Sequence, residues 1–211
     1  MQPLRTVAEI VAAGGCPPFA VDLQGWHSTD PFFAALLAEV KPKVIVEVGS
    51  WKGASAIHMA KLAPTARLFC VDPWVGSFEH WVDDFAEGKG LPFDRWGFPA
   101  LYPQFLANVF SCGVAHQIIP IPLPSTTGAK VLDRHGVTAD LVYIDGSHEE
   151  SDVAADIEAW WSRLRPGGVI FGDDVTMLPV WVAVAGSNVI NKYARVLGNF
   201  WLAQRPHELA S

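Results

Sequence analysis

Acidic residues lie at or beside the ends of four apolar runs, and their spacing is the first sign of chemistry. They are Glu47, Asp72, Asp145 and the adjacent pair Asp173 and Asp174. Parallel strands joined by right-handed crossovers all end on the same edge of a sheet. We therefore expect five carboxylates along one crevice, where something cationic must offset their mutual repulsion.

The last three of these carboxylates form a candidate metal site. Carboxylate oxygens without cysteine suit Mg²⁺, Mn²⁺ or Ca²⁺ better than zinc. We predict that Asp145, Asp173 and Asp174 hold a divalent cation, while Glu47 and Asp72 serve a nucleotide-type cofactor. For Asp173 and Asp174 the ordinary alternative is a solvated turn or a helix N-cap.

A histidine stands close to this candidate metal site. His148 follows Asp145 by three residues, at the start of an expected helix. A neutral imidazole there could take the proton of a metal-bound substrate hydroxyl near neutral pH. A surface histidine in a first helical turn is the alternative, and His80 is a second candidate base.

A glycine turn is expected to position the cofactor. The run from Val44 to Val48 is typical of a strand buried on both faces, with Glu47 expected to face the crevice. Gly49 and Gly53 follow, and a helix begins at Ala54, so a ligand can approach the backbone at a helix N-terminus. Asp72, about 20 positions beyond the turn, is where a ribose is usually held. A strand-end turn aspartate is the alternative.

The remaining pattern alternates strands and helices. A capping box is expected at Ser147 to Glu150, a turn at Pro166 to Gly168, and a hairpin at Gly198-Asn199. The expected helices cover about residues 6–13, 30–41, 54–63, 102–109, 128–133, 147–164 and 180–192, and the expected strands cover 44–48, 67–71, 117–121, 139–144, 169–171, 194–197 and 200–204.

The length and composition favour one α/β domain over residues 1–211, because half of the residues are hydrophobic. Residues 1–30 read as a helical appendage. Residues 75–103 form a long connection, expected to be a lid or acceptor-binding insert. Its rings could instead pack a small satellite core. The aromatic side chains of this insert are Phe78, His80, Trp81, Phe85, Phe93, Trp96, Phe98 and Tyr102.

Charge and cysteine usage limit the partners and the compartment. A formal net charge of -7 argues against a nucleic-acid partner, although a single tRNA-like contact stays open. Three cysteines without a CxxC pair indicate neither a disulfide framework nor a zinc site. No signal peptide or membrane span is recognisable, so we expect a cytoplasmic protein. Nine tryptophans and a mean hydropathy of +0.22 leave room for a homo-oligomer interface.

The ordered motifs resemble those of class I S-adenosylmethionine-dependent methyltransferases. The motifs are Glu47-x-Gly49-x-x-x-Gly53, Asp72, Asp145-Gly146-Ser147-His148, Pro166-Gly167-Gly168 and Gly172-Asp173-Asp174. The nearest type is the metal-dependent O-methyltransferases that include macrolide-sugar methyltransferases and the cephalosporin hydroxylase-like group, and catechol O-methyltransferase is more distant. The likeness covers roughly residues 40–205.

The resemblance implies a Rossmann-like doubly wound sheet of order 3-2-1-4-5-7-6, with the last strand antiparallel and helices on both faces. It implies that the two glycines flank the methionine moiety and that Asp72 holds the ribose. Asp145, Asp173 and Asp174 match the metal-ligand positions, and His148 matches the proposed base. The catechol type has a lysine at the position of His148. The expected cofactor-binding residues are Glu47, Gly49, Ser50, Trp51, Gly53, Ser55, Asp72, Trp74, Ser125 and Asp145.

The expected activity is metal-assisted O-methylation of a sugar or phenolic hydroxyl on a small molecule, with S-adenosylmethionine as donor and Mg²⁺ or another divalent cation. An NAD-dependent dehydrogenase shares the strand-turn-helix unit, but Trp51 stands where its fingerprint needs a second glycine. A hydroxylase-like reaction and a non-catalytic cofactor-binding or assembly module stay as alternatives.

Overall fold

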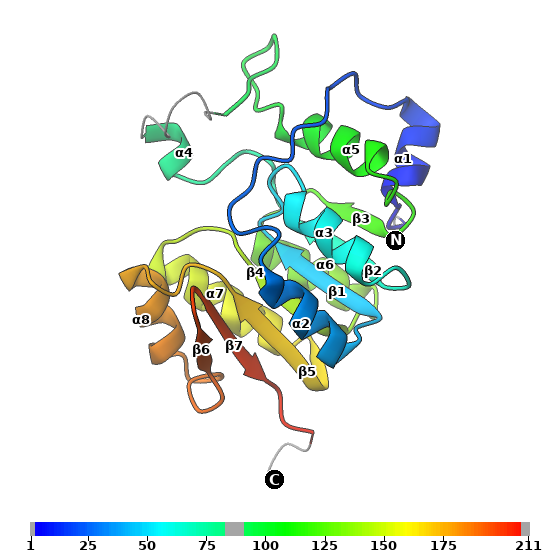
Figure 1. Cartoon of the computed structure of the whole chain (residues 1–211). Helices are drawn as coiled ribbons and strands as arrows, with labels where there is room; N and C mark the ends of the chain where they lie inside the picture. The colour runs from blue at the N-terminus through cyan, green and yellow to red at the C-terminus, as the bar shows by residue number, and fades with distance from the viewer. Residues whose placement is uncertain (1–2, 83–90, 208–211) are drawn as a thin grey trace.

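A seven-stranded sheet forms the centre of the computed structural model, which describes residues 3–82 and 91–207 (Figure 1). Its order is β3-β2-β1-β4-β5-β7-β6, and β7 runs antiparallel to both of its neighbours. The predicted sheet order and the antiparallel last strand are confirmed. The strands are β1 (Val44–Val48), β2 (Arg67–Val71), β3 (Ile118–Ile121), β4 (Ala139–Ile144), β5 (Leu164–Gly172), β6 (Arg195–Leu197) and β7 (Phe200–Gln204).

Helices cover both faces of the sheet (Figure 1). One apolar cluster joins the sheet to α1, α2, α3 and α5, and a second joins the opposite face to α6, α7 and α8. The helices are α1 (Val7–Gly14), α2 (Pro31–Val40), α3 (Ala54–Leu62), α4 (Glu79–Val82), α5 (Leu101–Ser111), α6 (Ser125–Arg134), α7 (Glu150–Trp161) and α8 (Leu178–Gly186).

Successive strand residues supply the two clusters in alternation. In β1, Ile45 belongs to the first cluster, whereas Val46 and Val48 belong to the second. Side chains alternate between the faces of a strand, so a run without polar interruption packs against helices on both sides. This explains why the central strands read as continuous apolar runs.

The chain between α1 and α2, residues 15–30, is here called the strap. It has no helix or strand of its own, and Phe19, Val21 and Trp26 are exposed. Asp30 caps α2 through a 2.8 Å hydrogen bond from Phe32 N to its carboxylate, as the Asp-Pro helix start predicts. The strap therefore ends at the first turn of α2.

Several expected element bounds are wrong. β5 begins at Leu164, because Leu164 pairs with Ala139 and the Pro166 to Gly168 segment continues the strand past an irregular register. α6 begins at Ser125 and α8 ends at Gly186. The capping box of α7 does not form, since Ser147 Oγ accepts from Glu149 N at 3.2 Å and the N-cap makes no side-chain hydrogen bond.

The long connection after β2 holds the short helix α4 and one isolated bridge between Phe93 and Pro99. Phe78, Trp81 and Trp96 are exposed, so they do not form the core of a satellite cluster. Phe85 lies outside the described residues. Within residues 3–82 and 91–207, no helix is long and apolar enough to cross a membrane.

Candidate active site

A cavity of about 860 Å³ opens over the carboxyl ends of the parallel strands. Its walls come from the loops after β1, β2, β3, β4 and β5, together with residues 24–28 of the strap. This is the place where open α/β sheets bind ligands, and the volume suits a small molecule of cofactor size.

The turn after β1 depends on glycine because the loop after β4 lies directly against it. Gly49 has a φ of 84°, and a Cβ atom there would lie 2.0 Å from the carbonyl oxygen of Asp145. Only glycine adopts this conformation without strain and allows such an approach. The turn and the Asp145 loop are therefore held as one unit at the edge of the cavity.

Asp72 fixes the strained turn from the end of β2. Its Oδ2 accepts from Trp51 N at 2.8 Å and its Oδ1 accepts from Trp74 N at 2.5 Å. Trp51 and Trp74 both have positive φ, which is uncommon for tryptophan, and Trp74 Nε1 donates to Trp51 O at 2.8 Å. Burial raises the pKa of Asp72 to about 6. Asp72 lines the cavity, as predicted.

Three expected cofactor contacts do not line the cavity. Glu47 has no exposed surface, and its Oε1 accepts from Ser55 Oγ at 2.6 Å beneath the turn. Gly53 lies against the ring of Phe105, and Trp74 is packed beside Tyr102. The expectation that Glu47 faces the crevice is wrong, because its side chain points to the face of β1 that α3 covers. Burial raises the pKa of Glu47 to about 7.

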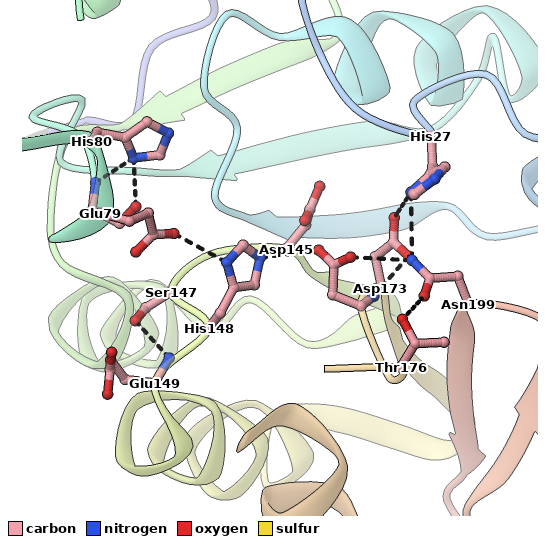
Figure 2. A network of polar contacts seen from close by, with 12 residues as sticks. His27, Glu79, His80, Asp145, Ser147, His148, Glu149, Asp173, Thr176 and Asn199 are labelled. Carbon is pink, nitrogen blue, oxygen red and sulfur yellow. Dashed lines mark hydrogen bonds and ion pairs between the residues drawn. The ribbon is translucent and has the colours of Figure 1, made fainter. Parts of the chain in front are cut away.

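Polar side chains from distant segments meet at the other end of the cavity (Figure 2). His148 Nδ1 lies 3.0 Å from Glu79 Oε1, and His148 Nε2 lies 3.0 Å from Asp174 Oδ2. The hydrogen bond to Asp174, assisted by the surrounding carboxylates, raises the pKa of His148 to about 9. In this arrangement His148 is a cation near neutral pH, whereas the sequence predicted a neutral base.

The neighbouring carboxylates of Asp145 and Asp173 have different hydrogen-bond partners. Tyr143 OH donates to Asp145 Oδ2 at 2.9 Å, and burial together with Asp173 raises the pKa of Asp145 to about 7. Asp173 does not line the cavity, and its Oδ2 lies 3.0 Å from Nδ1 of His27 in the strap (Figure 2). Asn199 Nδ2 donates to Asp173 Oδ1 at 2.5 Å.

The donor set partly fits the predicted metal site. In the described part of the chain, two groups have all their ligand atoms within 4.8 Å of one another: Asp145, His148 and Asp174, and His27, Asp173 and Asp174. The expected trio of Asp145, Asp173 and Asp174 is neither of them, because Asp173 bonds to the strap instead. The two carboxylates of the first group, Asp145 and Asp174, still fit a divalent cation beside His148, and such a cation would offset the mutual repulsion of the clustered carboxylates.

Most of the predicted residues nevertheless come together. Sequence patterns gave no signal for His27, Asn199 or the partner role of Glu79, because their contacts span 146, 26 and 69 positions. The predicted residues that line the cavity are Gly49, Ser50, Trp51, Ser55, Asp72, His80, Ser125, Asp145, His148 and Asp174.

A strand-end turn, a ribose-type aspartate and a polar cluster in one cavity are the features of a class I methyltransferase site. Residues 46–175 match a family described as a methyltransferase domain. The chain belongs to this family, and the predicted resemblance is confirmed.

Individual proteins are also similar to this chain, one in sequence and others in structure. An uncharacterized protein of Sinorhizobium fredii, y4gI, is 26% identical over 164 residues, which cover 75% of this chain and 16% of that protein. The chain thus spans about a sixth of the length of this curated relative. The O-methyltransferase TomG from Streptomyces achromogenes, solved with S-adenosylmethionine, has a TM-score of 0.61 and 18% identity over 95% of this chain and 87% of its own.

The TDP-rhamnose 3'-O-methyltransferase CalS11 of calicheamicin biosynthesis is a second similar structure. Its TM-score is 0.57, with 19% identity over 93% of this chain and 86% of its own. At these identities the two solved structures share the fold with this chain, and the residues of the cavity must indicate the chemistry.

Proposed function

We propose that the protein is an S-adenosylmethionine-dependent O-methyltransferase that acts on a hydroxyl of a small molecule with the help of a divalent cation. One observation carries this proposal. A single cavity joins the Gly49 turn to the cluster of Asp145, His148 and Asp174. The first part suits a nucleoside cofactor, and the second suits deprotonation of a hydroxyl.

The cofactor end acts mainly by positioning. Asp72 lines the cavity while backbone amides hold its carboxylate in place, and each carboxylate oxygen keeps a second lone pair that can accept from a ribose hydroxyl. The sulfonium of S-adenosylmethionine already activates the methyl group. The protein therefore has to align the acceptor oxygen for in-line attack, which depends on rigid placement of both reactants.

His148 is the group proposed to take the proton. Glu79 holds Nδ1, so that Nε2 points to Asp174 at the cavity wall. Asp174 raises the pKa of His148, so the ring becomes a base near neutral pH only when Asp174 is shared with another cation. His80 is a weaker candidate, because its Nδ1 accepts from Ser77 N at 3.1 Å and burial lowers its pKa.

Asp145 and Asp174 are the proposed ligands of that cation, whereas Asp173 belongs to the second group, with His27 and Asp174. A bound divalent cation would lower the pKa of the acceptor hydroxyl and offset the clustered carboxylates. Asp145 is already fixed for such a role by Tyr143 and by its contact with the Gly49 turn.

The acceptor is proposed to be a sugar or phenolic ring. Trp51 stacks on His80 with ring centroids 4.5 Å apart, and Trp26 contacts Trp51 at 6.1 Å; all three line the cavity. Flat apolar walls beside charged groups suit a ring that carries hydroxyls. The sugar acceptor of CalS11 and the small-molecule pathway of TomG support the same class.

Methyl transfer to a panel of sugar and phenolic hydroxyls, with and without Mg²⁺, tests the proposal. We expect transfer to at least one member, a strong loss of rate after chelation, and recovery with Mg²⁺. Asp174→Asn should abolish the response to Mg²⁺. Asp152→Asn is the matched control, because Asp152 lines the cavity but belongs to neither candidate metal group.

Ligand-induced thermal shifts separate the competing functions. Stabilisation by S-adenosylhomocysteine and not by NAD is expected; stabilisation by NAD alone would overturn the proposal in favour of a dehydrogenase. If the cofactor binds but no panel member is methylated, and Asp145→Ala leaves Mg²⁺ affinity unchanged, a non-catalytic binding module becomes the better description.

A further inference from the structure

Asp156 is a buried carboxylate of the cavity that the proposed chemistry does not use. It lies on α7, lines the cavity and is 7% exposed. Its hydrogen-bond partner is Ser125, whose Oγ accepts from Trp160 Nε1 at 2.8 Å. Among the residues the structure describes, no lysine, arginine or histidine pairs with Asp156. A buried carboxylate without a counter-charge is costly, so a further hydrogen-bond donor would be stabilising there.

The part of the cavity beside this carboxylate, here called the slot, has apolar lining residues. Val48, Val71, Pro124 and Ala155 line the cavity together with Asp156. Gly146 leaves the slot open, since a Cβ atom there would lie 3.7 Å from Val48 Cγ1 and 3.9 Å from Asp156 Oδ2. Apolar walls with one acceptor suit a flat heteroaromatic ring that presents a donor at its edge.

The slot also lies where the far end of the cofactor should reach. Val48 and Val71 belong to the cluster on the α6 and α7 face of the sheet, and Ser125 begins α6. Asp72 follows β2 and bonds to the Gly49 turn, and Ser125 follows the neighbouring strand β3, whereas His148 and Asp174 follow β4 and β5 on the other side of β1. A cofactor whose ribose lies at Asp72 would therefore place its base toward α6 and α7, away from His148.

We propose that Asp156 accepts a hydrogen bond from the 6-amino group of the cofactor's adenine and selects for a 6-aminopurine. This inference rests on the proposed function, because it requires an adenosyl cofactor in the cavity. Burial and the nearby Asp152 raise the pKa of Asp156 to about 6, which is consistent with a buried carboxylate that has a hydroxyl donor but no counter-charge.

Equilibrium binding of two ligands to the unmodified protein is the first test. S-inosylhomocysteine differs from S-adenosylhomocysteine by a 6-oxo group in place of the 6-amino group. Its carbonyl would face the carboxylate instead of donating to it. We expect it to bind about 10- to 100-fold more weakly by calorimetry, the range for losing a hydrogen bond to a charged group. Equal affinities for the two ligands would overturn the inference without any variant.

Asp156→Asn is the second test, because a carboxamide can turn either its amino group or its oxygen toward the ring. We expect the discrimination between the two ligands to shrink to a few-fold in this variant. Asp152→Asn, one turn earlier on α7, should keep it. Unchanged discrimination in Asp156→Asn overturns the inference and leaves the proposed function standing. Failure of the unmodified protein to bind S-adenosylhomocysteine overturns both.

Discussion

The two ends of the cavity are built in different ways. The cofactor end, around Gly49 and Asp72, consists of strand ends and backbone amides under close packing. The proposed acceptor end consists of side chains from distant segments: Glu79 of α4 contacts His148 in the loop after β4, and His27 of the strap contacts Asp173. The first is held by sterics and backbone geometry, whereas the second is held by ionic contacts.

This difference has a physical consequence for how each end responds to change. Contacts fixed by a backbone conformation fail when a residue cannot adopt that conformation. Ionic contacts between partly exposed side chains instead respond to pH, salt and ligands. The cofactor end should therefore be intolerant of substitution, and the acceptor end should be adjustable.

Two glycine substitutions test the comparison most strongly. Gly49 and Gly97 both have positive φ, at 84° and 79°, but only Gly49 has atoms within reach of an added Cβ. We expect Gly49→Ala to cost at least about 3 kcal/mol of unfolding free energy, since a backbone oxygen must move. Gly97→Ala, in the aromatic insert, should cost about 1 kcal/mol for its left-handed conformation alone. Chemical denaturation measures both, and equal costs would contradict the steric account of the Gly49 turn.

The second prediction in order of expected effect concerns replacement of the proposed base. His148→Gln should lower kcat by about 10²- to 10⁴-fold, the usual contribution of general base catalysis. Affinity for S-adenosylhomocysteine should stay unchanged, because His148 lies at the acceptor end. His80→Gln is the comparison, since His80 stacks on Trp51 in the same cavity. A large loss of kcat in His80→Gln with little loss in His148→Gln would indicate that His80, and not His148, is the base.

Sequence patterns predicted the cofactor end better than the acceptor end. The Val44 to Val48 run, its glycines and Asp72 are local signals, and the sheet order follows from the family resemblance. The prediction that Glu47 faces the crevice was wrong, and the reason is also local. Side chains alternate along a strand, and this one points beneath α3, where Ser55 donates to it. In this part of the chain, only the last residue of β1, Val48, and residues that follow it line the cavity.

The acceptor end was predicted in part. Asp145, His148 and Asp174 follow strand ends, so their meeting could be inferred from the order of the strands. His27 and Asn199 could not be inferred, because the first lies in an irregular strap and the second in a hairpin turn. Asp173 illustrates the consequence. It lies next to Asp174 as the sequence shows, but its carboxylate bonds to His27 of the strap and does not line the cavity.

The pH dependence of stability tests the ionic nature of the acceptor end. The pKa of His148 rises from 6.5 to about 9 on folding, so its contribution is fully present below pH 6.5 and is lost as the pH rises through 9. The full rise corresponds to about 3 kcal/mol, and solvent screening of the partly exposed ring lowers this to about 1–2 kcal/mol. Denaturation between pH 7 and 9.5 should show the unmodified protein losing this stability and His148→Gln losing less. If the unfolding free energy depended on pH equally in the two proteins, the ionic contacts of His148 would not explain the stability of this end of the cavity.

The smallest expected effect concerns the strap. Lys52, between the turn residues Trp51 and Gly53, donates from Nζ to Asp22 Oδ2 at 2.6 Å and to Gln24 Oε1 at 2.7 Å. The lysine is buried, but the Asp22 side chain is 47% exposed, so water can replace the lost partner. Lys52→Met keeps the buried length and removes the charge. We expect a loss of only about 1 kcal/mol of global stability.

The local consequence of this change should be larger than the global one. Without Lys52, the described contacts of the strap with the core include Asn108 with Asp22 and Gln104 with Ala20, so residues 15–30 should open more often. Faster proteolysis within the strap and a raised KM for the acceptor, with little change in S-adenosylhomocysteine affinity, are the expected results. Lys61→Met, at the exposed end of α3, is the matched control. If the strap of Lys52→Met resists proteolysis as well as that of the unmodified protein, Lys52 does not hold the strap to the turn after β1.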